Sequence, residues 1–164
     1  MHISLGLTSH LYALIRVIPA TTGDVLEMGV GIGSTPYLHW SCLGKRRLVS
    51  YESDPYYFKF FKGYAGEGHE MYLVDNYDQA DIEHEWEVAF IDHGPNARRI
   101  VDIKRVANYA KYIVVHDTAP KLDIHYNYSE IYPLFKYRID FPVARTHVSI
   151  LSNFIDVKEK FNSR

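Results

Sequence analysis

Five short apolar segments that run into glycine or acidic residues constrain the fold of this chain more than any other feature. Segments with helical spacing or helix-start signals lie between most of them. Strands that alternate with helices form a parallel sheet with right-handed crossovers. The carboxyl ends of such strands share one edge, where ligands of these folds bind. The apolar segments are residues 24–28, 47–51, 71–74, 88–91 and 112–115, and they run into Gly29, Glu52, Asp75, Asp92 and the pair His116-Asp117.

The remaining elements complete an α/β prediction. We expect a three-layer sandwich with a mostly parallel sheet, helices on both faces and an antiparallel pair of strands at the C-terminal edge. At this length the chain is predicted to form one domain, residues 1–164. Three helices are expected to begin at a capping residue, namely Ser9 for the helix over 9–18, Ser34 or Thr35 for the second, and Asp54, followed by Pro55, for the third. Two further helices are expected over residues 97–110 and 129–135. The last two strands are expected over residues 136–141 and 147–151.

The composition is that of a folded domain, with 47% apolar and 23% charged residues. The net charge of -2 gives no reason to expect a nucleic-acid or membrane partner. The single cysteine, Cys42, excludes an intrachain disulfide and favours a reducing compartment. We see no signal peptide and no membrane span, so a cytoplasmic location is expected. The basic runs 45–47 and 98–99 are expected to be solvated.

Three alternate glycines after the first strand form the most specific motif. The run from Glu27 to Gly33 joins a strand to a helix, and its glycines allow a tight turn and the close approach of a ligand. A dinucleotide fingerprint would need its third glycine where Ser34 stands. The Glu27 carboxylate suits a cationic or amino-bearing ligand better than a pyrophosphate. After the second strand, Glu52 can accept hydrogen bonds from both hydroxyls of a ribose.

These motifs resemble those of the class I S-adenosylmethionine-dependent methyltransferases, nearest to the small-molecule O-methyltransferase branch. The resemblance covers roughly residues 24–118. It implies a seven-stranded, Rossmann-like sheet whose last strand is antiparallel, and S-adenosylmethionine as the cofactor. The cofactor contacts that it implies are Glu27, Gly29, Gly31, Gly33, Ser34, Glu52, Asp75 and Asp92.

Two neighbouring strands are expected to bring two carboxylates and two imidazoles together. Asp92-His93 follows the fourth strand and His116-Asp117 follows the fifth, so these four residues are the candidates for activating an acceptor. A divalent cation, magnesium or manganese, held by Asp92 and Asp117 could lower the pKa of an acceptor hydroxyl. Imidazole ligands would move the preference toward manganese, iron or zinc. Without a metal, His93 or His116 could act as a general base.

The match to the metal-binding, catechol-type members of that branch is incomplete. Those members carry an Asn after the second acid, where this chain has Thr118, and a Lys shortly after the first, where it reads His93-Gly94-Pro95. The alternative is that Asp92 only helps to bind the cofactor, while Asp117 caps the following segment.

The acceptor side of the chain is small. A short N-terminal helix and the insert 123–132 stand in place of a separate lid domain, so we expect a shallow site or one completed by a second subunit. Tyr126, Tyr128 and Tyr132 could line an aromatic pocket or cover the end of the sheet. Aromatic residues surround the helix after Asp54, so some are expected at the surface, where a homodimer contact could form.

We predict a methyltransferase that moves the methyl group of S-adenosylmethionine to an oxygen, less favourably a nitrogen, of a small-molecule acceptor. Catalysis would be mostly positioning, because the cofactor already carries an activated methyl group. Two alternatives stay open. One is a non-catalytic module that binds S-adenosylmethionine or S-adenosylhomocysteine. The other is a nicotinamide-dependent oxidoreductase, which would need a dinucleotide to span the turn despite Glu27. Aminopropyl transfer shares the fold, but we see no clear pair of acidic polyamine-binding motifs for it.

Overall fold

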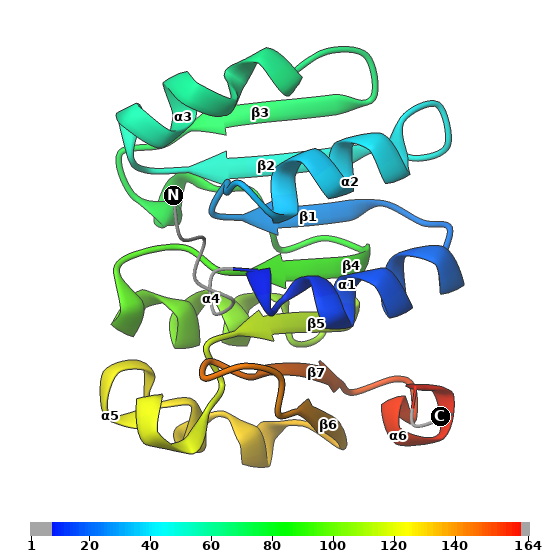
Figure 1. The fold of residues 1–164 in the computed structure, drawn as a ribbon, viewed down its shortest axis with the longest axis vertical. Helices are drawn as coiled ribbons and strands as arrows, with labels where there is room; N and C mark the ends of the chain where they lie inside the picture. The colour runs from blue at the N-terminus through cyan, green and yellow to red at the C-terminus, as the bar shows by residue number, and fades with distance from the viewer. Residues whose placement is uncertain (1–7, 162–164) are drawn as a thin grey trace.

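A computed structural model describes residues 8–161, and a seven-stranded sheet runs through its centre (Figure 1). The strand order is β3-β2-β1-β4-β5-β7-β6. Strands β1 to β5 pair in parallel, and β7 is antiparallel to both of its neighbours, β5 and β6. This confirms the predicted sheet with its antiparallel edge pair. The strands are β1 Val25–Met28, β2 Leu48–Glu52, β3 His69–Leu73, β4 Trp86–Ile91, β5 Ala110–His116, β6 Tyr137–Phe141 and β7 Val148–Ser152.

Helices cover both faces of the sheet, because successive strand residues point to opposite sides. Val25 of β1 packs with α1, α2 and α6 on one face, and Leu26 packs with α4 on the other. In Figure 1, α1 and α2 lie in front of the sheet. Among residues 8–161, no helix is long and apolar enough to cross a membrane. The helices are α1 Leu11–Val17, α2 Ser34–Cys42, α3 Pro55–Phe61, α4 Arg99–Val106, α5 Asp123–Tyr126 and α6 Val157–Phe161.

The helix cap at Asp54 is confirmed, and the other predicted caps are wrong. The Asp54 carboxylate accepts from the Tyr56 and Tyr57 amides, and Pro55 occupies the first turn of α3. Neither α1 nor α2 has a side-chain cap. Ser9 bonds instead to distant side chains, and Thr35 bonds back into the glycine turn, because tertiary partners compete for these hydroxyls.

The segment predicted as a helix over 129–135 forms two separate 3₁₀ turns, Tyr128–Glu130 and Tyr132–Leu134. Pro133 lacks the amide hydrogen that a continuous helix would need. Tyr126 and Tyr128 pack into the apolar core on the α4 face, so they cover the end of the sheet.

The aromatic helix α3 is only partly buried. Phe61 is buried, whereas Tyr56, Tyr57 and Phe60 are exposed. The prediction that some of these rings lie at the surface is confirmed, and a homodimer through them stays a prediction.

Candidate active site

The register of the sheet aligns the carboxyl ends of the central strands. Met28 pairs with Tyr51 on one side and with Ile91 on the other. Ile91 pairs in turn with Val115. The residues that follow these positions therefore lie along one edge, toward which the arrows of β1, β2, β4 and β5 point in Figure 1. This is the edge at which the sequence predicts a ligand.

The turn after β1 requires glycine because two backbones meet there. Gly29 has φ +91°, a conformation that side chains rarely allow. A Cβ at this position would lie 2.7 Å from His93 Cα and 2.8 Å from His93 N. The loops after β1 and β4 are thus in direct contact, which brings Asp92 beside the glycine turn.

Glu27 lies beneath this turn, fully buried. Its carboxylate accepts hydrogen bonds from Ser50 Oγ at 2.6 Å and from Thr35 Oγ1 at 2.9 Å. Thr35 Oγ1 accepts in turn from the Gly31 amide at 2.9 Å. Burial raises the pKa of Glu27 to about 7, against the lowering effect of its hydroxyl partners. The structure thus places this predicted cofactor contact inside the protein, where the carboxylate holds the shape of the turn.

Glu52 connects the end of β2 to the glycine turn. Its Oε2 accepts from the Val30 amide at 3.0 Å, and its Oε1 accepts from the Ser53 and Asp54 amides at 2.7 Å. Burial raises the pKa of Glu52, and these amide donors oppose the shift. Asp75, which follows β3, is exposed. Both acids therefore lie where the sequence predicts them.

Asp92 and His116 form a hydrogen-bonded pair across the ends of β4 and β5. His116 Nδ1 lies 3.0 Å from Asp92 Oδ1, and His116 Nε2 lies 2.8 Å from Ser9 Oγ. Burial opposes the charged form of His116, but the Asp92 and Asp117 carboxylates together outweigh it and raise the pKa of His116. Burial would likewise raise the pKa of Asp92, but His116 and Arg99 lower it.

Arg99 bridges the two carboxylates that the sequence predicts as metal ligands. Its Nη2 lies 2.9 Å from Asp92 Oδ1, and its Nη1 lies 3.1 Å from Asp117 Oδ2. Tyr126 donates a further hydrogen bond to Asp117 Oδ2 at 2.8 Å. Arg99 is only 5% exposed, so the prediction that the run 98–99 is solvated is wrong for this residue. A guanidinium thus stands between Asp92 and Asp117, where a shared cation was expected.

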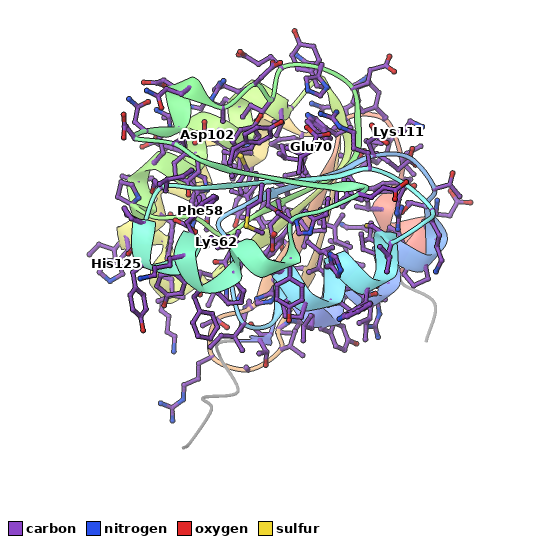
Figure 2. All side chains as sticks on the ribbon, turned by 90° about the horizontal axis from the view of Figure 1, so that it is seen from above. Phe58, Lys62, Glu70, Asp102, Lys111 and His125 are labelled. Atoms are coloured by element: carbon purple, nitrogen blue, oxygen red, sulfur yellow. The ribbon has the colours of Figure 1, made fainter. Side chains whose placement is uncertain are left out.

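The structure separates His93 from this cluster. Its Nε2 lies 2.9 Å from Asp102 Oδ2 on α4, a residue labelled in Figure 2, and both side chains are buried. Its ring packs against Tyr77 at 4.1 Å between centroids. His93 therefore belongs to the packing between β4 and α4, because the residue after Asp92 points to the opposite side.

His10 joins the cluster from the N-terminal segment, which no sequence pattern assigns to this edge of the sheet. Its side chain is 3% exposed, and its Nδ1 lies 3.7 Å from Asp92 Oδ2. The ring packs edge-on against His116 at 4.9 Å between centroids. Burial lowers the pKa of His10 to about 4, so the ring is neutral at pH 7. Neither His10 nor Arg99 carries a local sequence signal for this position, since their neighbours in the chain belong to other elements.

The strand order decides the type of fold. The chain has the fold of the class I S-adenosylmethionine-dependent methyltransferases. A putative O-methyltransferase from Klebsiella pneumoniae matches with a TM-score of 0.69 at 10% identity, over 94% of this chain and 83% of that one. Human methyltransferase-like protein 13 in complex with S-adenosylhomocysteine matches with a TM-score of 0.63 at 12% identity, over 93% and 82%.

A third methyltransferase structure has the same fold. The O-methyltransferase TomG from Streptomyces achromogenes, in complex with S-adenosylmethionine, matches with a TM-score of 0.61 at 14% identity, over 92% and 79% of the two chains. No protein-family model matches the sequence, and no curated protein matches it. The methyltransferase fold is therefore established by architecture, while the chemistry is argued from the site.

Proposed function

We propose that this protein binds S-adenosylmethionine over the glycine turn and Glu52 and transfers the methyl group to an oxygen of a small acceptor. The observation that carries the proposal is the 3.0 Å hydrogen bond between the Val30 amide and Glu52 Oε2. It joins the two parts of a nucleoside site, a turn that a ligand can approach and a carboxylate at the end of the next strand.

The residues around the turn fit such a cofactor. A Cβ at Gly31 would meet only Ser34 Oγ, at 3.6 Å, so the turn is open on that side. The Glu52 carboxylate has about four acceptor sites, and three backbone amides occupy one site on Oε2 and two on Oε1, so Oε2 keeps a site for a ribose hydroxyl. Asp92, the cofactor contact that the resemblance implies beside the turn, is 21% exposed in its side chain, and Arg99 and His116 already hold its Oδ1. The cofactor supplies an activated methyl group, and the protein supplies position.

The acceptor hydroxyl would lose its proton at the cluster of His10, Asp92 and His116. The sequence leaves two routes open there, direct transfer to an imidazole or activation by a cation. His116 Nε2 is bonded to Ser9, and His116 Nδ1 is bonded to Asp92, so neither nitrogen of this ring is free to take a proton from a ligand. Direct transfer to His116 would require one of these bonds to break, whereas the ring nitrogens of His10 have no hydrogen-bond partner among residues 8–161.

The test is calorimetric titration with S-adenosylhomocysteine of the wild type, Glu52→Ala and the control Glu67→Ala. Glu67 is exposed, so its loss should leave binding unchanged. We expect micromolar binding by the wild type and at least about a tenfold loss in Glu52→Ala, since charge-assisted hydrogen bonds contribute about 1.5–3 kcal/mol each. Circular dichroism checks that the variant is folded.

Each result of this titration has a defined meaning. No binding by the wild type would reject the proposal, and competition by NADH would then favour the oxidoreductase. Binding without methyl transfer to any of a panel of hydroxyl acceptors would favour the non-catalytic module.

A further inference from the structure

His10 has two buried ring nitrogens with no hydrogen-bond partner among residues 8–161. A buried polar atom without a partner costs free energy, so native structures rarely keep one without a reason. Nε2 of the ring lies against the glycine turn, because a Cβ on Gly33 would lie 2.9 Å from it. Nδ1 faces a cluster that already contains a carboxylate and a second imidazole.

The three side chains converge on one point. One ligand atom from each of His10, Asp92 and His116 lies within 4.8 Å of the other two. They come from the N-terminal segment, from the end of β4 and from the end of β5. Two imidazole nitrogens and one carboxylate oxygen form a ligand set that binds first-row transition metals and leaves positions open for a substrate.

We propose that His10, Asp92 and His116 bind one divalent transition-metal ion, of the manganese, iron, cobalt or zinc class. The site takes one oxygen and two nitrogens, so it disfavours magnesium and calcium, which prefer oxygen ligands. It differs from the Asp92–Asp117 pair that the sequence predicts, and Arg99 explains the difference.

The position of Arg99 leaves one oxygen of Asp92 available as a metal ligand. It occupies Oδ1 of Asp92 and Oδ2 of Asp117, and it leaves Asp92 Oδ2 facing His10. The carboxylates of Asp92 and Asp117 carry two negative charges and the guanidinium of Arg99 one positive charge, so one net negative charge is left to attract a cation. Asp117 itself is held by Arg99 and Tyr126, so it supplies orientation rather than a ligand atom.

Ser9 holds the second histidine in a suitable orientation. In the tautomer that donates from Nε2–H to Ser9 Oγ, 2.8 Å away, Nδ1 carries a lone pair directed at the cluster. In this tautomer Nδ1 cannot donate to Asp92 Oδ1, 3.0 Å away, so it is available to a metal. Metal–ligand bonds of about 2.0–2.2 Å place neighbouring ligand atoms about 3–3.5 Å apart. His10 Nδ1 and Asp92 Oδ2 are 3.7 Å apart, and the three ligand atoms lie within 4.8 Å of one another, so metal binding would draw the side chains inward by up to about 1–2 Å.

The use of this ion in methyl transfer rests on the proposed function, whereas the metal site itself does not. A bound ion would lower the pKa of an acceptor hydroxyl and hold its oxygen at the edge of the sheet. The ion, and not an imidazole, would then activate the hydroxyl, and the contact between His116 Nδ1 and Asp92 Oδ1 would give way to a bond between Nδ1 and the metal.

The experiment titrates chelator-treated protein with Co(II), followed by its visible absorption, and with Mn(II), Zn(II) and Mg(II) by calorimetry. No S-adenosylmethionine is present. We expect one Co(II) per chain and Mg(II) binding at least about tenfold weaker. His10→Gln and Asp92→Asn should each weaken Co(II) binding by at least about 100-fold, beyond the 10–100-fold that outer-shell changes cost. The control is His125→Gln, since His125 is exposed and projects from the edge of the molecule (Figure 2).

A second measurement uses the wild type alone and does not depend on the folding of a variant. Long-range ¹H–¹⁵N spectra of the histidine rings, recorded during Zn(II) titration, should shift the nitrogens of His10 and His116 together and leave those of His125 in place. No metal binding by the wild type, unchanged binding in folded His10→Gln, or shifts confined to other histidines would overturn the proposal. Metal binding without S-adenosylhomocysteine binding would reject the methyltransferase proposal alone.

Discussion

At the scale of single residues, Glu27 is the side chain with the most unusual environment. Ser50 Oγ donates to its carboxylate, and His69 Nε2 lies 2.9 Å from the same hydroxyl. His69 Nδ1 lies 3.1 Å from Nδ1 of the half-buried His39. Since the hydroxyl proton goes to Glu27, His69 donates through Nε2 and accepts through Nδ1. A continuous chain of hydrogen bonds thus links the carboxylate beneath the glycine turn to a partly exposed histidine.

This environment predicts a pH-dependent contribution of Glu27 to stability. Its pKa is about 7 in the folded protein and 4.5 as the reference value, so the folded state binds the extra proton between these values. The free energy of unfolding from this group is therefore highest below pH 4.5 and falls by about 2–3 kcal/mol as pH rises to 7. Glu27→Gln should remove this decrease, measured by urea unfolding at pH 5, 6, 7 and 8.

Other buried groups change the free energy of unfolding with pH in the opposite direction. The difference between Glu27→Gln and the wild type is therefore more informative than either curve alone. Burial lowers the pKa of His10 and His69 to about 4, so their contributions rise with pH between about 4 and 6.5. The contribution of His10, which is no part of the chain of hydrogen bonds from Glu27, cancels when Glu27→Gln is compared with the wild type. His69 is linked to Glu27 through Ser50, so a shift in its own pKa is followed separately by NMR titration of its ring. Parallel curves for the two proteins would show that Glu27 titrates normally, and Glu67→Gln serves as the exposed control.

At the scale of elements, the close approach of the loops after β1 and β4 decides the geometry of the site. Gly29 has a positive φ and lies against the His93 backbone. The same contact fixes Asp92, whose amide donates to the Met28 carbonyl at 2.9 Å. The glycine turn, which would contact the cofactor, is thus joined to Asp92 of the cluster in one structural unit.

Gly29→Ala should disrupt the contact between the loops after β1 and β4 and destabilise the protein. A Cβ placed within 2.8 Å of backbone atoms forces the loops apart, and the positive φ adds strain, so we expect a loss of about 2–4 kcal/mol in the free energy of unfolding. The matched variant is Gly63→Ala, where nothing lies within 4 Å of an added Cβ and a change within about 0.5 kcal/mol is expected. Urea denaturation compares the two, and equal stabilities would contradict the proposed contact.

At the scale of the whole molecule, the site depends on how α1 docks. Leu14 and Val17 of α1 are buried in the core on the α1 face. The preceding Ser9 lies 2.8 Å from His116 Nε2 and 2.6 Å from Thr146 Oγ1. Two segments more than 100 residues further along the chain thus meet at this serine, and the docking of α1 carries His10 to Asp92.

Ser9→Ala should loosen this docking without unfolding the sheet. Loss of the buried hydrogen bonds predicts a cost of about 1–2 kcal/mol. Amide hydrogen exchange should become faster in α1 and remain unchanged in α4, as mass spectrometry can resolve. The exposed Ser129→Ala provides the control. Equal acceleration in both helices would indicate a general loss of stability instead.

The sequence by itself determined the sheet, the glycine turn and the acids at the ends of the strands. Apolar segments, glycines and acidic residues are local patterns, and a parallel sheet brings its carboxyl ends to one edge whatever the details of packing. Glu52, Asp92 and His116 could therefore be assigned to that edge before any coordinates were known.

Only the tertiary structure decided which side chains meet at that edge. Arg99 is buried between two carboxylates and His93 is directed into the α4 face, although their neighbours in sequence suggest a solvated pair and a site residue. His10 reaches Asp92 through the docking of a helix more than 70 residues away in the chain. These positions depend on how apolar faces far from the site pack against each other. That packing decides where each polar side chain points, and no local sequence pattern encodes it.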